Sequence, residues 1–203
     1  MTIRLVLDYG GTIVDHGDVR ERAELLGVDS DDELARVGLA YFAFRDGFVG
    51  AYLDRLGTLT GASREACRAY LDRRWLDPTF PESHADLLHE LADDHALVPF
   101  SNGVRPWIET VSAEHGVRDA FDDLVVSSDL RRAKPHPKGY LACLPETDER
   151  VVMVSDEYDE DLLTAETLGM GSVWLERDAE TPSREPDARI ASLTDLPSVL
   201  PLD

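Results

Sequence analysis

The chain has 203 residues, of which 43% are hydrophobic, so it can form one core domain with an inserted subdomain. Acidic residues outnumber basic ones by 41 to 20, and the net charge of −21 argues against nucleic acid and anionic membranes as partners. No stretch approaches the roughly 20 apolar residues of a membrane span, and the N-terminus lacks a signal pattern, so we expect a cytoplasmic protein.

The first predicted element is a short buried strand over residues 3–7, which ends at Asp8 and opens into a glycine-rich loop. Residues 17–77 then carry helical periodicity with little strand signal, and we expect four helices there around a shared apolar core. The residues that separate these helices are Gly27, Asp29 or Ser30, Gly57 and Ser63. A helical block placed directly after the first strand is expected to form a lid over Asp8.

From residue 81 onward, predicted helices and strands alternate. The helices span residues 81–95, 106–115, 137–144 and 159–169, and the strands span residues 96–100, 124–126, 151–154 and 172–175. This alternation is typical of a mainly parallel sheet with helices on both faces. We therefore predict a Rossmann-like α/β core formed by residues 1–15 and 79–203, with an α-helical cap inserted at residues 16–78.

Asp8 ends the first strand, at the rim of the sheet where open α/β folds bind their ligands. Its carboxylate can act as a nucleophile on phosphorus or on carbon. The loop that follows contains Gly10, Gly11 and Thr12, and its glycines let backbone amides approach an anion closely. The alternative is an aspartate that only caps the turn.

A second polar cluster, Ser101-Asn102-Gly103, follows the strand that ends at residue 100. It offers a hydroxyl, an amide and backbone N–H groups to a bound oxyanion. The same three residues also form a common structural turn. Because the carboxyl ends of parallel strands meet in one crevice, we expect this cluster to lie near Asp8.

Lysine has almost disappeared from the chain, since only Lys134 and Lys138 are found among the 20 basic residues. An acidic, lysine-poor composition is typical of proteins that work in concentrated salt, where screening relieves self-repulsion. We therefore predict a halophilic source, the alternative being an acidic protein from a mesophile.

Lys134 is retained between a predicted strand and Pro135, which fixes the start of the next helix. Its compact ammonium group can neutralise a nucleophilic carboxylate and a substrate oxyanion together, and this electrostatic effect often dominates catalysis. We interpret His136 as a surface loop residue and not as a base.

Five acidic residues lie within the six positions from Asp156 to Asp161, directly after the strand that ends at residue 154. Such a cluster would repel itself unless a cation compensates its charge. Together with Asp8 at the same edge of the sheet, it predicts a divalent cation with oxygen ligands, and we expect Mg²⁺. For Asp159 and Glu160 the alternative is a solvated acidic surface, and Asp156 is the better ligand.

In their order along the chain, these motifs resemble those of the haloacid dehalogenase-like hydrolase superfamily over about residues 3–176. The family places its helical cap after the first motif in some members, uses the leading aspartate as nucleophile, and holds Mg²⁺ with the last motif. The resemblance implies catalytic roles for Asp8, Ser101, Asn102 and Lys134, substrate contacts for Gly11, Thr12 and Gly103, and metal contacts for Asp8, Gly10, Asp156 and Asp161. For Asp161 the alternative is a position near the lysine.

One residue departs from the pattern of the family's phosphatases. They carry a second aspartate two residues after the nucleophile, which protonates the leaving group and activates water, and here that residue is Gly10. Loss of such a group typically lowers the rate by ~10²–10⁴. The family's dehalogenases have tyrosine at this position and its phosphonoacetaldehyde hydrolases have alanine, so a non-acidic residue is compatible with catalysis.

The other motifs separate these branches. The dehalogenases use no metal and have a largely neutral fourth motif, whereas Asp156 and its acidic neighbours favour metal-dependent phosphoryl transfer. The phosphonoacetaldehyde hydrolases use a cap lysine for a Schiff base, and residues 16–78 contain no lysine, which excludes that chemistry in its usual form.

Three functions stay open. The first is a Mg²⁺-dependent phosphatase for a small molecule, which forms an aspartyl-phosphate on Asp8. The second is a 2-haloacid dehalogenase or another carbon-centred hydrolase, and the third is a catalytically weak phosphate-binding or regulatory protein. In the first, the leaving group takes its proton from water, the substrate or a cap residue such as Arg20, Tyr41 or Arg45. Both enzymatic functions require the Lys134 ammonium group to lie beside Asp8.

Overall fold

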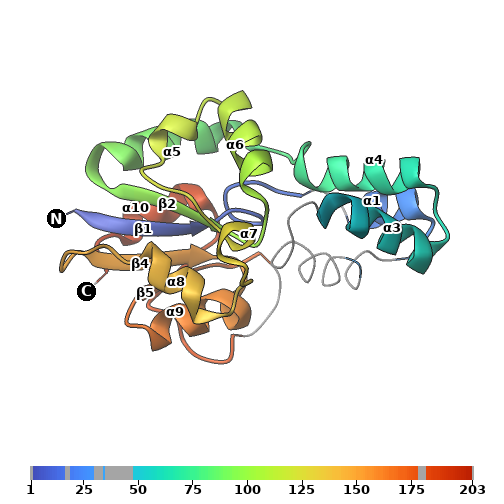
Figure 1. Cartoon of the computed structure of the whole chain (residues 1–203). Coiled ribbons are helices and arrows are strands. Elements are labelled where there is room, and N and C mark those ends of the chain that lie inside the picture. The colour runs from blue at the N-terminus through green and yellow to red at the C-terminus, as the bar shows by residue number, and fades with distance from the viewer. Residues whose placement is uncertain (1, 17–18, 30–33, 35–47, 178–181, 203) are drawn as a thin grey trace.

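A computed structural model describes residues 2–16, 19–29, 34, 48–177 and 182–202 (Figure 1). Its centre is a six-stranded sheet with the order β3-β2-β1-β4-β5-β6. The strands are β1 (Ile3–Asp8), β2 (Ala96–Ser101), β3 (Val125–Val126), β4 (Arg150–Ser155), β5 (Gly171–Leu175) and β6 (Ala188–Ile190). Every pairing between them is parallel, which confirms the predicted α/β class.

Helices cover both faces of the sheet (Figure 1). One face carries α5 (Glu82–Asp94), α6 (Arg105–Glu114) and α10 (Leu196–Val199), and the other carries α8 (Pro137–Cys143) and α9 (Leu163–Thr167). A short helix, α7 (Ser127–Leu130), follows β3. The predicted helix over residues 159–169 differs at its start, because its first turn, Tyr158–Leu162, is a π-helix.

The central strand β1 is apolar on both faces, as expected for a strand covered by helices on each side. Leu5 and Leu7 pack toward α5 and α6, whereas Val6 packs toward α8 and α9. All three side chains are fully buried, and burial of each contributes about 1.5–3 kcal/mol to stability. The apolar run therefore fixes β1 in the middle of the sheet and places Asp8 at its carboxyl end.

The described part of the helical insert contains α1 (Val19–Leu26), α3 (Phe48–Thr60) and α4 (Arg64–Trp75). The predicted cap at Ser63 is confirmed, since its side chain accepts a hydrogen bond from the Ala66 amide at 3.1 Å. Helix α3 continues past Gly57, where an end was predicted, and stops before Gly61, whose φ is +74°. Most of the second predicted helix lies outside the described residues. Leu34, which is described, belongs to the insert's core.

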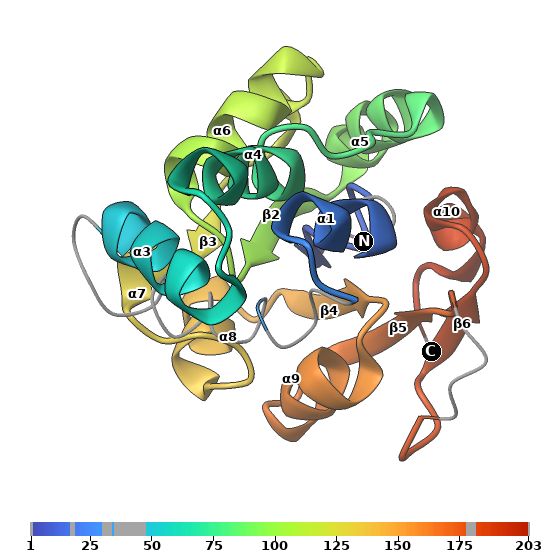
Figure 2. The same ribbon diagram turned by 90° about the vertical axis from the view of Figure 1, so that its right-hand side faces the viewer.

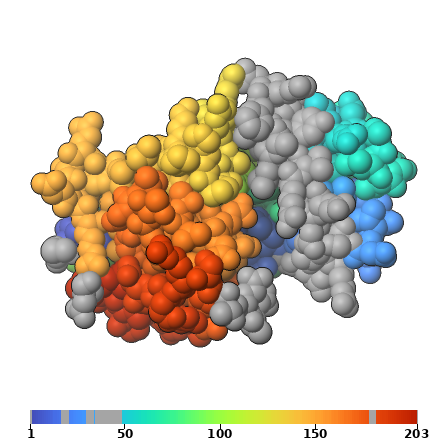
Figure 3. All heavy atoms as spheres, turned by 90° about the horizontal axis from the view of Figure 1, so that it is seen from below, coloured from blue at the N-terminus to red at the C-terminus, as the bar shows by residue number. Residues whose placement is uncertain are grey.

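The insert has its own apolar core and faces the carboxyl ends of the strands. Its buried residues include Tyr52, Leu56, Cys67 and Tyr70. In Figure 1 the strand arrows point toward the insert, and Figure 2, viewed from that side, shows α1 and α4 in front of the sheet. Seen from below, the orange residues of α9 lie on the left side of the molecule and the blue and cyan residues of α1 and α3 on the right (Figure 3). The helical cap is thus confirmed as an insertion between β1 and β2.

The two connections between core and insert run side by side. Asp15 and Thr79 form an antiparallel bridge in which the Asp15 amide donates to the Thr79 carbonyl at 2.8 Å and the Thr79 amide donates back at 2.7 Å. The bridge lies at the predicted limits of the cap, although the boundaries at residues 16 and 78 stay a prediction. Among the described residues, no helix combines the length and the apolar character needed to cross a membrane.

Candidate active site

The polar loops that follow β1, β2 and β4 meet around one cavity of about 440 Å³. These strands are neighbours in the sheet, so their carboxyl ends lie together. The predicted site residues that line the cavity are Asp8, Gly10, Gly11, Ser101, Asn102, Lys134, Asp156 and Asp161. Thr12 and Gly103, which were also predicted to contact substrate, do not line it.

Lys134 lies at the centre of this site. Its Nζ donates to Asp8 Oδ1 and to Asp161 Oδ2, both at 2.6 Å, and all three side chains are buried. Nζ also lies 5.2 Å from the centre of the Phe100 ring, within the range of a cation–π contact. The predicted proximity of Lys134 and Asp8 is therefore confirmed.

The charges in this cluster do not balance. Burial by itself would lower the pKa of Lys134, but the charges of Asp161 and Asp8 and their hydrogen bonds outweigh it and raise the pKa above its usual value. Burial raises the pKa of Asp8 well above its usual range, and Asp161 and Asp156 add to this against the opposing charge of Lys134. One ammonium group thus faces three carboxylates.

The backbone of Lys134 is held by Asn102. Asn102 Oδ1 accepts hydrogen bonds from the Lys134 amide at 2.7 Å and from Ser127 Oγ at 2.6 Å. The β2 loop therefore fixes the loop that carries the lysine. Ser127, fully buried, was not predicted, because its position after β3 becomes relevant only once Asn102 points toward it.

Ser101 ends β2 and is buried with its Oγ at the cavity. This Oγ accepts a hydrogen bond from the Gly103 amide at 3.0 Å, which makes a tight turn. A Cβ on Gly103 would lie 3.0 Å from both Ser101 Oγ and the Trp75 ring. In this structure Gly103 therefore shapes the Ser101 turn, and its predicted contact with substrate stays a prediction.

Asp156 follows β4 and is tied to the first loop. Its amide donates to Thr12 Oγ1 at 3.3 Å, and Thr12 Oγ1 donates to Asp156 Oδ1 at 3.2 Å. Gly11 has a φ of +87°, and a Cβ there would collide with Asp156 Oδ2. Burial raises the pKa of Asp156. Thr12 and Gly11 thus allow the Asp156 carboxylate to lie against the loop that carries Asp8.

Asp161 contacts Lys134 directly. Its Oδ2 accepts from Lys134 and, at 2.9 Å, from Ser155 Oγ, while its Oδ1 is buried without a hydrogen-bond partner among the described residues. Of its acidic neighbours, Glu160 lines the cavity, whereas Asp159 is exposed and accepts hydrogen bonds from Ser183.

These residues fit a Mg²⁺ site in which the protein supplies few ligands. The described residues contain no group of three His, Cys, Asp or Glu side chains in metal-binding geometry. Mg²⁺ is usually held by one or two carboxylates and several waters. Asp8 and Asp156 can supply those carboxylates, and the partnerless Oδ1 of Asp161 can accept from a bound water. A divalent cation would also offset the excess negative charge.

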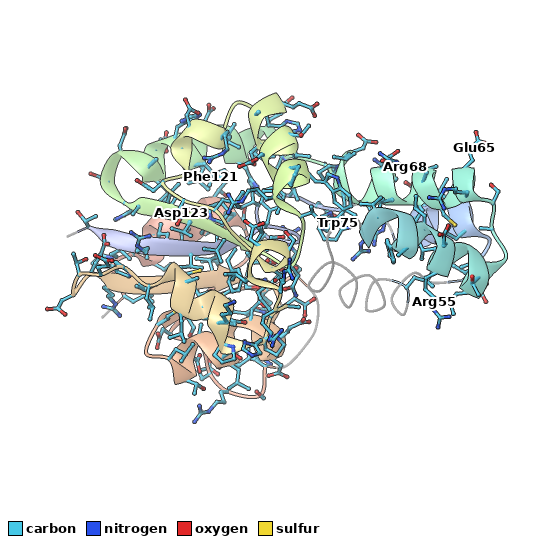
Figure 4. All side chains as sticks on the ribbon, viewed as in Figure 1. Arg55, Glu65, Arg68, Trp75, Phe121 and Asp123 are labelled. Atoms are coloured by element: carbon cyan, nitrogen blue, oxygen red, sulfur yellow. The ribbon has the colours of Figure 1, made fainter. Side chains whose placement is uncertain are left out.

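Sequence patterns did not identify the wall of the cavity that comes from the insert and the β5 loop. It is formed by His16, Arg22, Arg74, Trp75 and Arg177. Trp75 ends α4 and lies next to the core, far from Glu65 and Arg68 on the same helix (Figure 4). Of the predicted proton donors, Tyr41, Arg45 and the Arg20 side chain lie outside the described residues.

A family comparison matches residues 5–169 to the haloacid dehalogenase-like hydrolases. A curated phosphoserine phosphatase from Thermus thermophilus is 26% identical over 158 residues, which is 75% of this chain and 64% of that protein. The chain thus spans just under two thirds of that relative's length.

Solved structures share the fold. L-2-haloacid dehalogenase from Xanthobacter autotrophicus with covalently bound chloropropionic acid has a TM-score of 0.77 at 20% identity, with 98% of each chain covered. The magnesium-bound HAD-hydrolase YfnB from Bacillus subtilis has a TM-score of 0.69 at 18% identity, with 99% of this chain and 100% of that chain covered. With the family match over most of its length, the chain belongs to the haloacid dehalogenase-like hydrolases.

Proposed function

We propose that this hydrolase is a Mg²⁺-dependent phosphatase for a small phosphate ester, with Asp8 as its nucleophile. The observation that carries the proposal is the position of the Asp8 carboxylate, 2.6 Å from the Lys134 ammonium nitrogen, in a cavity that Asp156 also lines. The cavity volume, about 440 Å³, suits a small molecule. The phosphatase among the curated relatives supports the same reaction class.

In the first step a carboxylate oxygen of Asp8 forms a bond to phosphorus while the bond from phosphorus to the leaving oxygen breaks. The electron pair of the broken bond stays on the leaving oxygen. Lys134 stabilises the negative charge on the transferring group, and Ser101 Oγ and the backbone amide of Asn102 can donate hydrogen bonds to its oxygens.

In the second step water attacks the phosphorus of the aspartyl-phosphate. The bond from phosphorus to Asp8 breaks, its electron pair returns to the carboxylate, and the proton of the water leaves with the phosphate product or passes to solvent. A magnesium ion held by Asp8, the Gly10 carbonyl and Asp156 would neutralise charge on the phosphoryl oxygens when bound. Asp161 keeps Lys134 charged and in place throughout.

A second candidate is a 2-haloacid dehalogenase. The specific observation in its favour is Gly10, which leaves the loop without the acid of a phosphatase, and the fold neighbour with bound chloropropionic acid is consistent with it. A third candidate is a phosphate-binding protein with little turnover. Asp156 beside the Asp8 loop favours the phosphatase, because a second, half-buried carboxylate serves a metal and has no use in a metal-free displacement.

The test compares p-nitrophenyl phosphate hydrolysis with chloride release from 2-chloropropionate, each in high salt with Mg²⁺ and with chelator. We expect phosphate hydrolysis that requires Mg²⁺ and falls by at least ~10⁴ in Asp8→Asn, as expected for loss of a nucleophile. Asp93→Asn, on the exposed side of α5, is the matched control and keeps full activity. Chloride release without metal would instead select the dehalogenase, and phosphate binding without turnover the third candidate.

A further inference from the structure

Gly10 is a glycine for reasons of space and not of backbone conformation. It is absent from the described glycines with positive φ, so an L-residue could adopt its backbone angles. A Cβ built on it, however, would collide with His16 Nε2 and would lie 2.9 Å from His16 Cδ2. The His16 imidazole therefore occupies the volume that any side chain at position 10 would enter.

The backbone and the ring of His16 are held from several directions. His16 directly follows Asp15, which is bridged to Thr79, and its carbonyl accepts a hydrogen bond from the buried Arg22. Its ring meets the Trp75 ring in an edge-on contact, with centroids 5.3 Å apart. The ring lines the cavity, and its Nδ1 is buried without a hydrogen-bond partner among the described residues.

The surroundings of His16 disfavour the charged form of its ring. Burial, followed by the positive charges of Arg74 and Arg22, lowers its pKa to about 3, against weaker opposing effects of a hydrogen bond with the Arg74 backbone and of the Asp15 charge. A neutral imidazole carries one N–H donor and one acceptor nitrogen. The cavity thus contains a hydrogen-bonding group held at the place where the family's phosphatases carry their second aspartate.

We propose that His16 replaces the side chain missing at position 10 and donates a hydrogen bond to the leaving oxygen of the phosphate ester. This inference rests on the proposed phosphatase function. When the bond from phosphorus breaks, the electron pair collects on the leaving oxygen, and the imidazole N–H stabilises that charge. The oxygen then takes its proton from water, so His16 itself neither gains nor loses a proton.

A side chain at position 10 and the His16 ring compete for the same space. A side chain at position 10 would displace the imidazole from its observed position, so Gly10→Asp alone introduces a collision with His16. Restoring the aspartate requires removal of the ring in the same variant. This relationship gives two independent tests, one kinetic and one thermodynamic.

The kinetic test measures kcat/KM for aryl and alkyl phosphates whose leaving groups differ widely in basicity. Basic alkyl leaving groups need the hydrogen bond, whereas p-nitrophenolate leaves without help. In His16→Leu we expect a loss of about 10²-fold for an alkyl phosphate, as for removal of an oxyanion donor, and of at most about threefold for p-nitrophenyl phosphate. His16→Gln, which keeps an N–H donor, should retain most of the alkyl activity. His89→Leu on α5, away from the cavity, is the control.

Each kinetic outcome is decisive. An equal loss on both substrate types would assign His16 a structural role and overturn the inference while leaving the phosphatase function intact. Failure of the unmodified protein to hydrolyse any phosphate ester would overturn the phosphatase function and this inference with it.

The thermodynamic test needs no activity. Gly10→Ala should lower the melting temperature of the full chain, and in a His16→Ala background the same substitution should have little effect. Gly50→Ala in α3, where a Cβ would meet only Arg64 at 3.7 Å, is the matched control and should not lower it. The same loss from Gly10→Ala in both backgrounds would show that the imidazole does not occupy this space, and the inference would fail.

Discussion

Lys134 and Asp161 form an ion pair in which Nζ and Oδ2 lie 2.6 Å apart and the side chains are only 5% and 1% exposed. A buried pair of this kind is demanding, because removal of one partner leaves the other charge without compensation. The same ammonium group also contacts Asp8, so a change at Lys134 affects both the stability of the protein and the proposed nucleophile.

Replacement of Lys134 should therefore destabilise the protein strongly. Lys134→Met leaves Asp8 and Asp161 buried next to each other, and we expect the free energy of unfolding in urea to fall by about 3–5 kcal/mol. Arg68→Met is the control, because its pair with Asp72 is exposed and should contribute less than about 1 kcal/mol. Similar losses in the two variants would show that the buried cluster contributes no more to the free energy of unfolding than an exposed ion pair.

The raised pKa of Asp8 predicts a dependence of stability on pH. Burial, with the charges of Asp161 and Asp156, raises this pKa above the ordinary value of 3.8, although Lys134 opposes the shift. The contribution of Asp8 is then fully present below pH 3.8 and is lost as the pH rises through the folded-state pKa. In chelator, Asp8→Asn should gain stability relative to the unmodified protein as the pH rises from about 4 to about 8.

Urea denaturation at a series of pH values measures this difference, with Asp93→Asn as the exposed control. Addition of Mg²⁺ should reduce it, because a bound cation favours the charged form of Asp8. A loss of relative stability in Asp8→Asn with rising pH would contradict the raised pKa.

Gly11 and Gly116 allow backbone strain to be separated from collision. Both have positive φ, +87° and +68°, but a Cβ on Gly116 would meet nothing within 4 Å, whereas one on Gly11 would displace Asp156. We expect Gly116→Ala to destabilise by about 1 kcal/mol and Gly11→Ala by about 3 kcal/mol or more. Only Gly11→Ala should also lower phosphatase activity and the apparent affinity for Mg²⁺. Equal effects of the two substitutions on stability would show that Asp156 does not lie against Gly11.

The net charge of −21 predicts a dependence on salt. Self-repulsion among the acidic residues falls as the Debye length shortens from about 8 Å to about 3 Å between 0.15 M and 1 M salt. The melting temperature should therefore rise by about 5 °C or more as KCl is increased to about 3 M. Sorbitol at equal osmolality is the control, and an equal rise in sorbitol would remove the electrostatic explanation and weaken the prediction of a halophilic source.

The sequence could predict those parts of the site that local pattern determines. Asp8, Ser101 and Asp156 each come at or directly after an apolar run, and a parallel sheet brings the ends of such runs together. The proximity of Lys134 to Asp8 followed from the same rule. The helical class of the insert was also predictable, because its apolar residues recur at helical spacing.

The sequence could not predict which polar residues support others. Thr12 bonds to Asp156 and Asn102 holds the Lys134 backbone, and both contacts depend on side-chain orientation at a loop. His16 and Trp75 reach the cavity because the insert folds back over the strand ends, a relationship between segments that spacing along the chain does not encode.

The bridge between Asp15 and Thr79 joins the two chain connections between the insert and the core. His16 sits beside this bridge, whereas Trp75 lies at the end of α4. A swing of the insert about the bridge would carry Trp75 through a wider arc than His16. Such a movement would open the cavity to substrate and product while the imidazole stays next to Gly10. The proposed contact with the leaving group would then stay with the loop that carries Asp8 and would not move with the insert.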